Sequence, residues 1–240
     1  MNMKKNGFSL VELIIAMAVG LFIMTAIYAI INLAQRSSVS VGRKVVTQQD
    51  ARAVLDLMAM EIRMASFNPT MSTTIWSTIP TAACASMGSV TPVKAKKGIQ
   101  TATASTILIA MDLSNPTVYP AVIGDAANEY IEYSYNGADT ITRNVSCSGD
   151  TPILGGAGSA TKVNNNSAGV NLLTYFDGNG TDITASVTNG NTSTTNGIPA
   201  IRRIRITIVA NTESSDSLTN KPRIMTYTTD ILVKNHAFSP

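Results

Sequence analysis

The sequence is poor in the residues from which most metal sites and catalytic centres are built. Its 240 residues include one histidine and two cysteines. A zinc site built from Cys/His pairs and a dense disulfide framework are therefore excluded, because both need more of these residues. The single histidine, His236, stands alone near the C-terminus, where we expect it at the surface. No nucleophile is grouped with a base, so no set of residues argues for an enzyme.

Charge is also scarce. Charged residues make up 14% of the chain, whereas a soluble domain usually carries about 25%. The formal net charge of +3 is too small for a protein that holds nucleic acid by bulk charge. The hydrophobic share of 45% excludes a disordered chain. The length allows one large domain or two small ones.

Most of the apolar excess lies in residues 8–33, where Glu12 is the only charge. A membrane-spanning helix needs about 20 residues, so this run predicts a transmembrane segment over 8–33. It is too long for the core of an ordinary signal peptide, the alternative, and no small-x-small cleavage site follows it. Lys4 and Lys5 precede the run, which places the N-terminus in the cytoplasm and the rest of the chain across the membrane. Three cations follow the run and reduce the difference in positive charge between its two flanks: Arg36, Arg43 and Lys44.

Glu12 needs an explanation, because a carboxylate in a membrane helix costs several kcal/mol unless it is paired or reaches the interface. Its flanks supply one. The basic leader Lys4-Lys5-Asn6-Gly7 runs directly into Phe8-Ser9-Leu10-Val11-Glu12. This pattern closely resembles the class III signal of type IV pilins and of type II secretion pseudopilins. The resemblance implies that prepilin peptidase removes residues 1–7, cutting between Gly7 and Phe8, and that Phe8 is methylated. Loss of the leader lowers the formal net charge from +3 to +1.

The resemblance also gives Glu12 a role in assembly. In the family, this Glu pairs with the N-terminal amine of a neighbouring subunit in the filament. Phe8 and Glu12 are four residues apart and therefore share one helix face. Two opposite charges relieve each other's desolvation cost, so an unpaired Glu12 in lipid would favour assembly. The partners implied are other major and minor pilins or pseudopilins, prepilin peptidase, an inner-membrane assembly platform and membrane lipid.

The helix is expected to continue to residue 66. No proline occurs before Pro69, and Gly20 and Gly42 are the places where we expect the helix to bend. Apolar residues recur at helical spacing along one stripe: Ala51, Val54, Leu55, Met58, Ile62 and Ala65. This stripe should carry a soluble domain over residues 67–240. Residues 55–65 also resemble the end of this helix in PilW-like minor pilins and J-type pseudopilins.

Beyond Pro69, strand-like runs alternate with turn residues. Strands are predicted at 106–111, 129–135, 139–146, 170–176, 200–210 and 223–234, and the second and third form a hairpin around Asn136-Gly137. Residues 148–169 and 186–198 are interpreted as loops, and 68–105 are not assigned. The predicted fold is α+β: one long helix whose second half packs on an antiparallel sheet. The same order of elements is found in pilins.

Three smaller features have competing interpretations. Cys84 and Cys147 lie in the part predicted to be outside the cytoplasm, where a disulfide is favoured over two buried thiols. Asp177, Asn179 and Asp182 begin like a calcium loop, but positions six and twelve lack the Gly and Glu of an EF-hand. A turn is therefore favoured, with calcium as the alternative and no other cofactor expected.

The basic clusters 94–97 and 202–205 could contact the phosphates of nucleic acid. They are better interpreted as solvated charge, since no aromatic residues are interleaved with them. Nucleic acid is therefore not an expected partner.

Taken with the resemblance, these features predict a minor pilin of a type IV pilus, with no catalysis of its own. It would be anchored once in the inner membrane, with its C-terminal domain in the periplasm, and then assembled into the filament or at its tip. The large soluble portion favours a minor subunit over a compact major pilin. The alternatives are a J-type pseudopilin of a type II secretion system and a pilus-tip adhesin or DNA-binding subunit.

Overall fold

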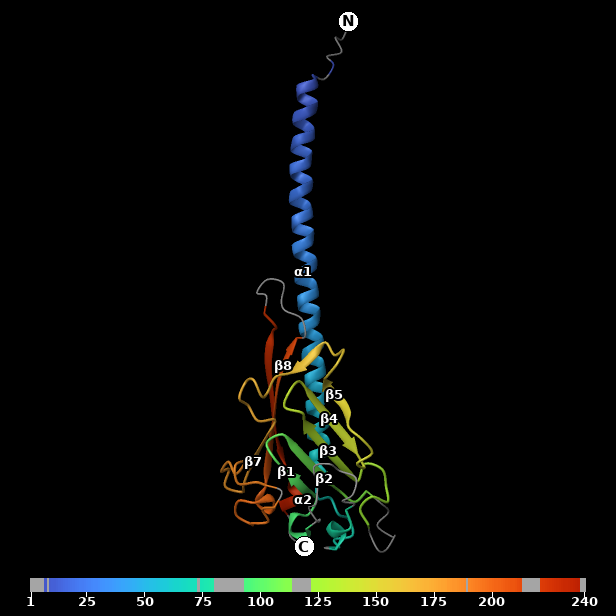
Figure 1. Ribbon diagram of the computed structural model, residues 1–240, viewed down its shortest axis with the longest axis vertical. Coiled ribbons are helices and arrows are strands. Elements are labelled where there is room, and N and C mark those ends of the chain that lie inside the picture. Colours follow the sequence, from blue (N-terminus) through green and yellow to red (C-terminus); the bar gives the residue numbers. More distant parts are fainter. Residues whose placement is uncertain are drawn as a thin grey trace.

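A single long helix dominates the molecule. The computed structural model describes residue 7 and residues 9–72, 74–79, 93–113, 122–188, 190–212 and 221–237. Helix α1 runs from Leu10 to Arg63 without interruption, which makes it about 80 Å long at 1.5 Å per residue. Its N-terminal half projects from a β-rich head as an uncovered stalk (Figure 1). The helix continues through Gly20 and Gly42, where bends were expected.

The apolar stripe predicted on the second half of α1 is the part that the head covers. Thr47 is the first buried residue of the helix. All six residues of the stripe are buried: Ala51, Val54, Leu55, Met58, Ile62 and Ala65. The helix ends at Arg63, and Ser66 adopts a left-handed φ of 65° that turns the chain away from the helix axis. The predicted helical stripe is therefore confirmed.

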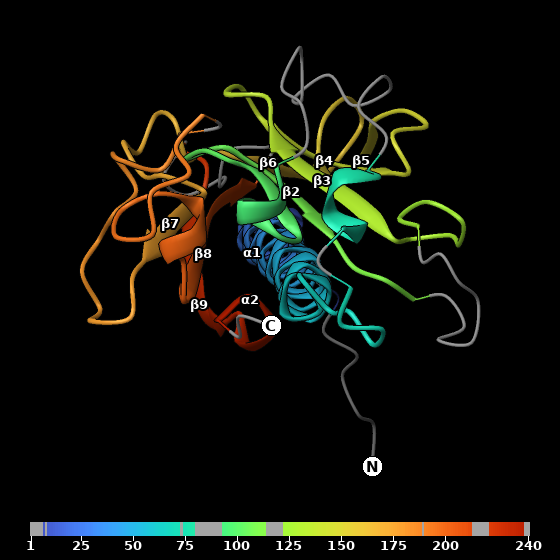
Figure 2. The same cartoon turned by 90° about the horizontal axis from the view of Figure 1, so that it is seen from below.

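Two antiparallel sheets, rather than the one expected, hold this half of the helix. The first has the order β1-β2-β3-β4-β5. Its strands are β1 (Ile99–Ala102), β2 (Thr106–Ala110), β3 (Tyr130–Tyr135), β4 (Thr140–Val145) and β5 (Thr151–Gly155). In the second, β8 (Arg203–Thr212) pairs with β6 (Thr161–Val163) and β7 (Leu173–Phe176) along one edge and with β9 (Ile224–Leu232) along the other. Seen along the helix, the sheets flank α1 on two sides (Figure 2).

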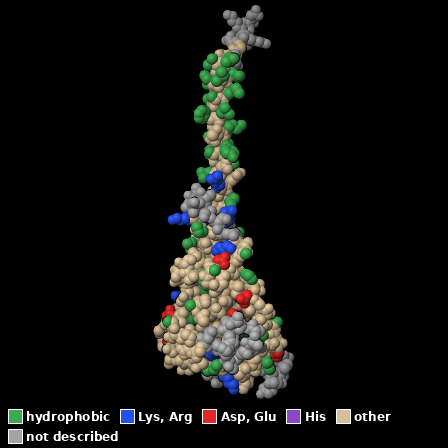
Figure 3. Space-filling model, in the orientation of Figure 1, with side chains coloured by type: hydrophobic (Ala, Val, Ile, Leu, Met, Phe, Trp, Pro, Cys, Tyr) green, Lys and Arg blue, Asp and Glu red, His purple; other side chains and the backbone are tan. Residues whose placement is uncertain are grey.

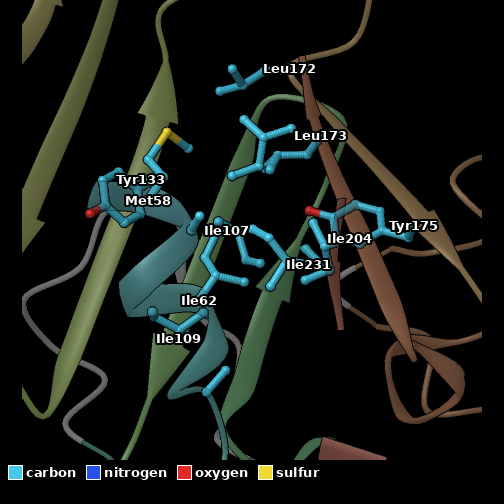
Figure 4. Close-up of a cluster of buried hydrophobic side chains, with 14 of the residues drawn as sticks. Met58, Ile62, Ile107, Ile109, Tyr133, Leu172, Leu173, Tyr175, Ile204 and Ile231 are labelled. Atoms are coloured by element: carbon cyan, nitrogen blue, oxygen red, sulfur yellow. The ribbon is translucent and has the colours of Figure 1, made fainter. Parts of the chain in front are cut away.

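The main core lies where α1 meets both sheets. Met58 and Ile62 from the helix contact a cluster built from β2, β3, β7, β8 and β9 (Figure 4). Side chains predicted to point inward from β8 are fully buried there: Ile204, Ile206 and Ile208. A second, smaller core covers the other face of β2 and β3 and contains Ile75 and Trp76 from the short helix η1 (Ile75–Ser77). Burial on both faces explains the continuous apolar run of β2.

The predicted hairpin is confirmed, and its turn chemistry is visible. The Asn136 side-chain Oδ1 accepts hydrogen bonds from the backbone N–H groups of Ala138, Asp139 and Thr140. Gly137 has a φ of +76°, which glycine adopts without strain. The loop prediction for 148–169 is wrong in part, because β5 and β6 lie inside it. These strands are short and lie among glycines, so their composition resembles that of a loop.

Four further elements of this head were not expected from the sequence. Strand β1 lies in the unassigned region, together with the short helix η2 (Lys94–Lys96). Near the C-terminus, the short helix α2 (Lys234–Ala237) packs beneath the head, and η3 (Ile198–Ala200) precedes β8. Both β1 and η3 are almost wholly buried, so tertiary contacts rather than local pattern decide their structure.

Candidate functional site

The N-terminal processing region lies at the free end of the stalk. Gly7 is exposed, and a Cβ added there would meet no atom within 4 Å. Packing against the described residues therefore does not require glycine at this position. Lys4, Lys5 and Phe8 lie outside the described residues, so the cleavage assignment stays a prediction.

Glu12 lies in the first turn of α1 and closes a capping box. Ser9 is the N-cap, and its side chain accepts a hydrogen bond of 3.3 Å from the Val11 N–H. One carboxylate oxygen of Glu12, Oε2, accepts from the Ser9 N–H at 3.0 Å. The carboxylate thus points back toward the start of the helix, the end that carries Phe8. A capping box needs Glu three residues after Ser, so the helix itself accounts for part of the Ser9-x-x-Glu12 pattern.

The stalk that follows has no cover in the described structure. Its large apolar side chains from Leu10 to Leu33 are between 48% and 80% exposed, and hydrophobic side chains lie along the whole visible face of the stalk (Figure 3). The most apolar window of α1 has a mean hydropathy of 2.6 and no buried residue. Length and composition suffice to cross a membrane. An apolar surface of this size requires lipid or other helices around it.

Near the C-terminal end of α1, inside the head, an ion pair joins the helix to the first sheet. Arg143 on β4 makes a bidentate contact with Glu61 on α1, through Nη2 to Oε1 at 2.6 Å and Nε to Oε2 at 3.1 Å. The Tyr133 hydroxyl on β3 donates to the same carboxylate. Burial and the nearby Glu61 raise the pKa of Tyr133 well above its usual range. The structure pairs Tyr133 with Arg143 across the predicted hairpin, but the sequence did not single out Glu61 as their partner.

The far end of α1 is fixed by His236, which was predicted at the surface and is in fact 1% exposed. Its Nε2 lies 3.0 Å from the carbonyl of Ile198, which can only accept, so Nε2 carries the proton. Its Nδ1 then accepts from the Ser66 hydroxyl at 2.9 Å. Ser66 also accepts from the Gly98 N–H, which draws the ends of α1, β1 and α2 together. The prediction failed because a C-terminal position in sequence says nothing about burial.

The acidic loop resembles a turn more than a cation site. Asp177 Oδ1 accepts from the backbone N–H groups of Asn179 and Thr181, and Asp182 Oδ1 accepts from Thr184. These are Asx turns, in which the carboxylate satisfies its own loop. Among the described residues, no three His, Cys, Asp or Glu side chains are grouped so as to hold a metal ion. The calcium prediction for Asp177, Asn179 and Asp182 has not been tested with the ion.

Of the two cysteines, Cys147 is disulfide-bonded in the structure. It lies in the smaller core, beside η1. Cys84 lies outside the described residues, so the Cys84–Cys147 pairing stays a prediction.

The two basic clusters differ in their surroundings. Lys96 was expected in solvent but is 1% exposed, and burial lowers the pKa of its amine. Arg203 and Arg205 point outward as predicted, and both bind the Asp230 carboxylate. The Arg203 guanidinium also stacks over the ring of Phe176, 3.9 Å from its centroid. Hydrogen bonds from Arg205 hold the pKa of Asp230 below its usual range.

Comparison with known proteins adds one finding at the site itself. Residues 2–28 match the family model of the prokaryotic N-terminal methylation motif. No curated protein and no solved structure matches the chain. The match covers the leader, Glu12 and most of the uncovered apolar helix. The motif points to a structural subunit rather than an enzyme, and it supports a pilin-like or pseudopilin substrate of prepilin peptidase.

Proposed function

We propose that the chain is a minor pilin of a type IV pilus. It is made as an inner-membrane precursor, cut between Gly7 and Phe8, methylated on Phe8, and assembled into the filament or at its tip. The observation that carries this proposal is the uncovered apolar helix that begins with a methylation motif and a first-turn Glu12. Such a helix has two successive surroundings. Lipid covers it before assembly, and the helices of neighbouring subunits cover it afterwards.

Glu12 gives the transfer from lipid to filament its direction. In the isolated chain its carboxylate is satisfied in part by the Ser9 N–H. A carboxylate has room for further donors, so the amine of a neighbouring Phe8 can join the same oxygens without breaking the capping box. An ion pair in an apolar surrounding is stronger than in water. The gain from this pair favours the assembled state.

The large head favours a minor subunit over a major one. Two sheets flank α1, and a second core lies on the face of the first sheet away from the helix, so the head is larger than we expect of a compact major pilin. A J-type pseudopilin of a type II secretion system would use the same helix and the same processing. A pilus-tip adhesin or DNA-binding subunit would use the same anchor with a surface ligand, and no group on the described head favours that reading over the minor pilin.

Mass spectrometry of the purified protein and of sheared filaments tests the proposal. We expect a chain that begins with N-methyl-Phe8, together with co-purifying pilins of a pilus system. Gly7→Val should leave the precursor uncut, because the peptidase recognises that glycine, while membrane insertion through α1 continues. Retention of Met1 in cells with an active prepilin peptidase would overturn the proposal. Co-purification with secretion components alone would assign the chain to a pseudopilus.

A further inference from the structure

The outer edge of β9 is a long sheet margin that no described strand pairs. On its inner side, β9 pairs with β8 through nine consecutive residue pairs with no shift of register. On its outer side, no strand of the described chain is hydrogen-bonded to it, and β9 forms the margin of its sheet in Figure 2. The outer side of β7 differs, because Phe176 forms a bridge to Asp182 and the Tyr175 N–H donates to Thr184.

The register shows which backbone groups face outward. The Thr212 N–H donates to the Arg223 carbonyl at one end of the β8–β9 pair, and the Val233 N–H donates to the Arg202 carbonyl at the other. Bonded and non-bonded pairs alternate along an antiparallel ladder. The odd-numbered residues of β9 therefore bond to β8. The N–H and C=O groups that point away from β8 belong to Ile224, Thr226, Thr228, Asp230 and Leu232.

This edge lacks the features by which proteins usually block strand addition. Those features are proline, lysine, a bulge or a short strand. The strand from Ile224 to Leu232 contains no proline and no lysine, and its pairing has no bulge. Its one charge, Asp230, is bound by Arg203 and Arg205. The apolar side chains at its two ends, Ile224 and Leu232, are each 59% exposed.

We propose that the outer edge of β9 receives an extended segment of a neighbouring, different subunit of the filament, which adds to the sheet as an antiparallel strand. This inference rests on the proposed function, because it takes a filament subunit as the occupant. Strand addition gives affinity through backbone hydrogen bonds and selectivity through alternate side chains. Since β9 packs against α1, the added strand would lie beside the helix that brings neighbouring subunits together.

Charge and side-chain size around the edge define the partner segment. Exposed cations flank the strand: Lys221 precedes it, and Lys234 follows it. Within the strand the outward side chains are uncharged apart from the neutralised Asp230. The complementary segment therefore has β-branched or apolar residues in its centre and carboxylates near its ends.

A second copy of this chain cannot pair with the edge through its own β9. Two β9 strands paired antiparallel would be related by a two-fold axis across the strands. Strand β9 runs alongside α1 (Figures 1 and 2), so that axis would point the two α1 helices in opposite directions. Two subunits anchored in one membrane have parallel helices. The contact is therefore heterologous, as it is in a growing filament.

Proline substitution at outward-facing amides tests the proposal in the full-length protein. Thr226→Pro with Thr228→Pro removes two outward N–H donors and leaves the backbone hydrogen bonds to β8 intact, and proline is tolerated at such edge positions. The bond from the Thr228 hydroxyl to Thr207 on β8 is lost in this variant and in the alanine control alike. The matched control, Thr226→Ala with Thr228→Ala, keeps both donors. A second control, Thr229→Pro, removes a donor to β8 and should unfold the head. Each strain is scored for membrane level, N-terminal processing, protease resistance of the head, and the fraction of the subunit in sheared filaments.

We expect the proline pair to keep its membrane level, processing and protease resistance while its fraction in filaments falls at least tenfold. The alanine pair should stay within twofold of the wild type. If the proline pair loses protease resistance, Thr228→Lys replaces it, because a lysine on an edge strand opposes the addition of a further strand. This variant should show the same loss from filaments. Wild-type incorporation of the proline or lysine variant with an intact head would overturn the strand addition and leave the proposed function standing. Absence of the wild-type subunit from filaments would overturn both.

A photo-crosslinking amino acid at position 228 identifies the occupant in cells. We expect one adduct with a different pilin of the same system, and its loss in a strain that lacks that pilin. An adduct between two copies of this chain would contradict the occupant proposed here.

Discussion

At the scale of single residues, His236 is the most informative. It is the only histidine of the chain, and burial lowers its pKa from 6.5 to about 4. The neutral ring accepts from Ser66 and donates to Ile198, so a second proton, on Nδ1, would require the Ser66 hydroxyl to turn from donor to acceptor. Lys97 and Arg202, which lie close by, also disfavour the charged form. The fold therefore requires the neutral ring.

The pH dependence of stability follows from this requirement. The folded pKa lies below the unfolded one, so the unfolded chain binds the proton first as the pH falls. The neutral ring contributes fully to the free energy of unfolding above pH 6.5, and this contribution is lost between pH 6.5 and about 4. The shift in pKa corresponds to a contribution of about 3 kcal/mol. Urea unfolding at pH 7.5, 6.0 and 5.0 should show the loss, and His236→Gln should flatten it. If the unfolding free energies of the two proteins changed equally with pH, the pKa of His236 would not be lowered by folding.

Glu12 is the second residue whose environment decides its role. Glu12→Leu removes a carboxylate from an exposed apolar helix, which should ease membrane insertion by a few kcal/mol. Processing should continue, because it depends on Gly7 and the leader, but filaments should become fewer because the neighbouring amine loses its partner. Glu12→Gln separates the two parts of the role, since the amide still accepts from the Ser9 N–H but carries no charge. Normal filament numbers in both strains, where this subunit is required, would leave Glu12 with capping alone.

Sequence and structure agree at these residues only where the pattern is local. The spacing from Ser9 to Glu12 is a local signal, and the structure has the capping box that it specifies. The burial of His236 depends on a distant segment that contains Ile198. The burial of Lys96 accompanies the contacts of η2 with η1 and η3, which are also distant in sequence. No periodicity marks either side chain. A lone titratable residue near a chain end can therefore be placed only once the tertiary contacts are known.

At the scale of elements, the join between α1 and the first sheet depends on one charged cluster. The side chains of Arg143 and Glu61 are 21% and 13% exposed, so solvent screens them only in part. Removing one partner leaves the other charge poorly solvated. Each single substitution, Glu61→Ala or Arg143→Ala, should cost about 2–3 kcal/mol of unfolding free energy. The double variant should cost less than the sum, with a coupling of about 1–2 kcal/mol.

Denaturant unfolding of the four proteins measures this coupling. Tyr133→Phe serves as the control, because it removes one hydrogen bond to Glu61 and leaves the ion pair and the ring in place. It should cost about 1 kcal/mol. Strict additivity of Glu61→Ala and Arg143→Ala would mean that the helix is held by the apolar stripe alone.

Elements with strong periodicity could be predicted from the sequence, and those without it could not. The helix, the hairpin and the β8–β9 pair follow from apolar spacing and turn residues. Strands β5 and β6 lie among glycines, and Gly155 closes so tightly on Asp139 that an added Cβ would lie 1.8 Å from its carbonyl oxygen. That glycine is required by strand packing, although in sequence it is typical of a loop. The division into two sheets depends on pairing between distant segments, which no local pattern shows.

At the scale of the whole molecule, the stalk and the head are energetically separate. Thr47 is the first buried residue of α1, and the contacts that hold the helix begin with Asp50, whose Oδ2 accepts from Thr161 on β6 at 3.0 Å. The apolar side chains of the stalk contribute nothing to the core of the head. Substitutions in the stalk should therefore leave the folding of the head unchanged.

This separation predicts that residues 37–240 fold as a soluble domain. Their unfolding free energy should match that of the full chain within about 1 kcal/mol, because no buried side chain is lost. A longer deletion, through Leu57, removes the buried Ala51, Val54 and Leu55 and should leave no cooperative transition.

When the domain is made in an oxidising compartment, a thiol assay after unfolding should detect no free cysteine, because Cys147 is bonded. Its predicted partner Cys84 closes a long loop, so reduction should cost about 4 kcal/mol. Two free thiols would contradict the disulfide, whereas loss of folding in the domain of residues 37–240 would show that the stalk stabilises the head.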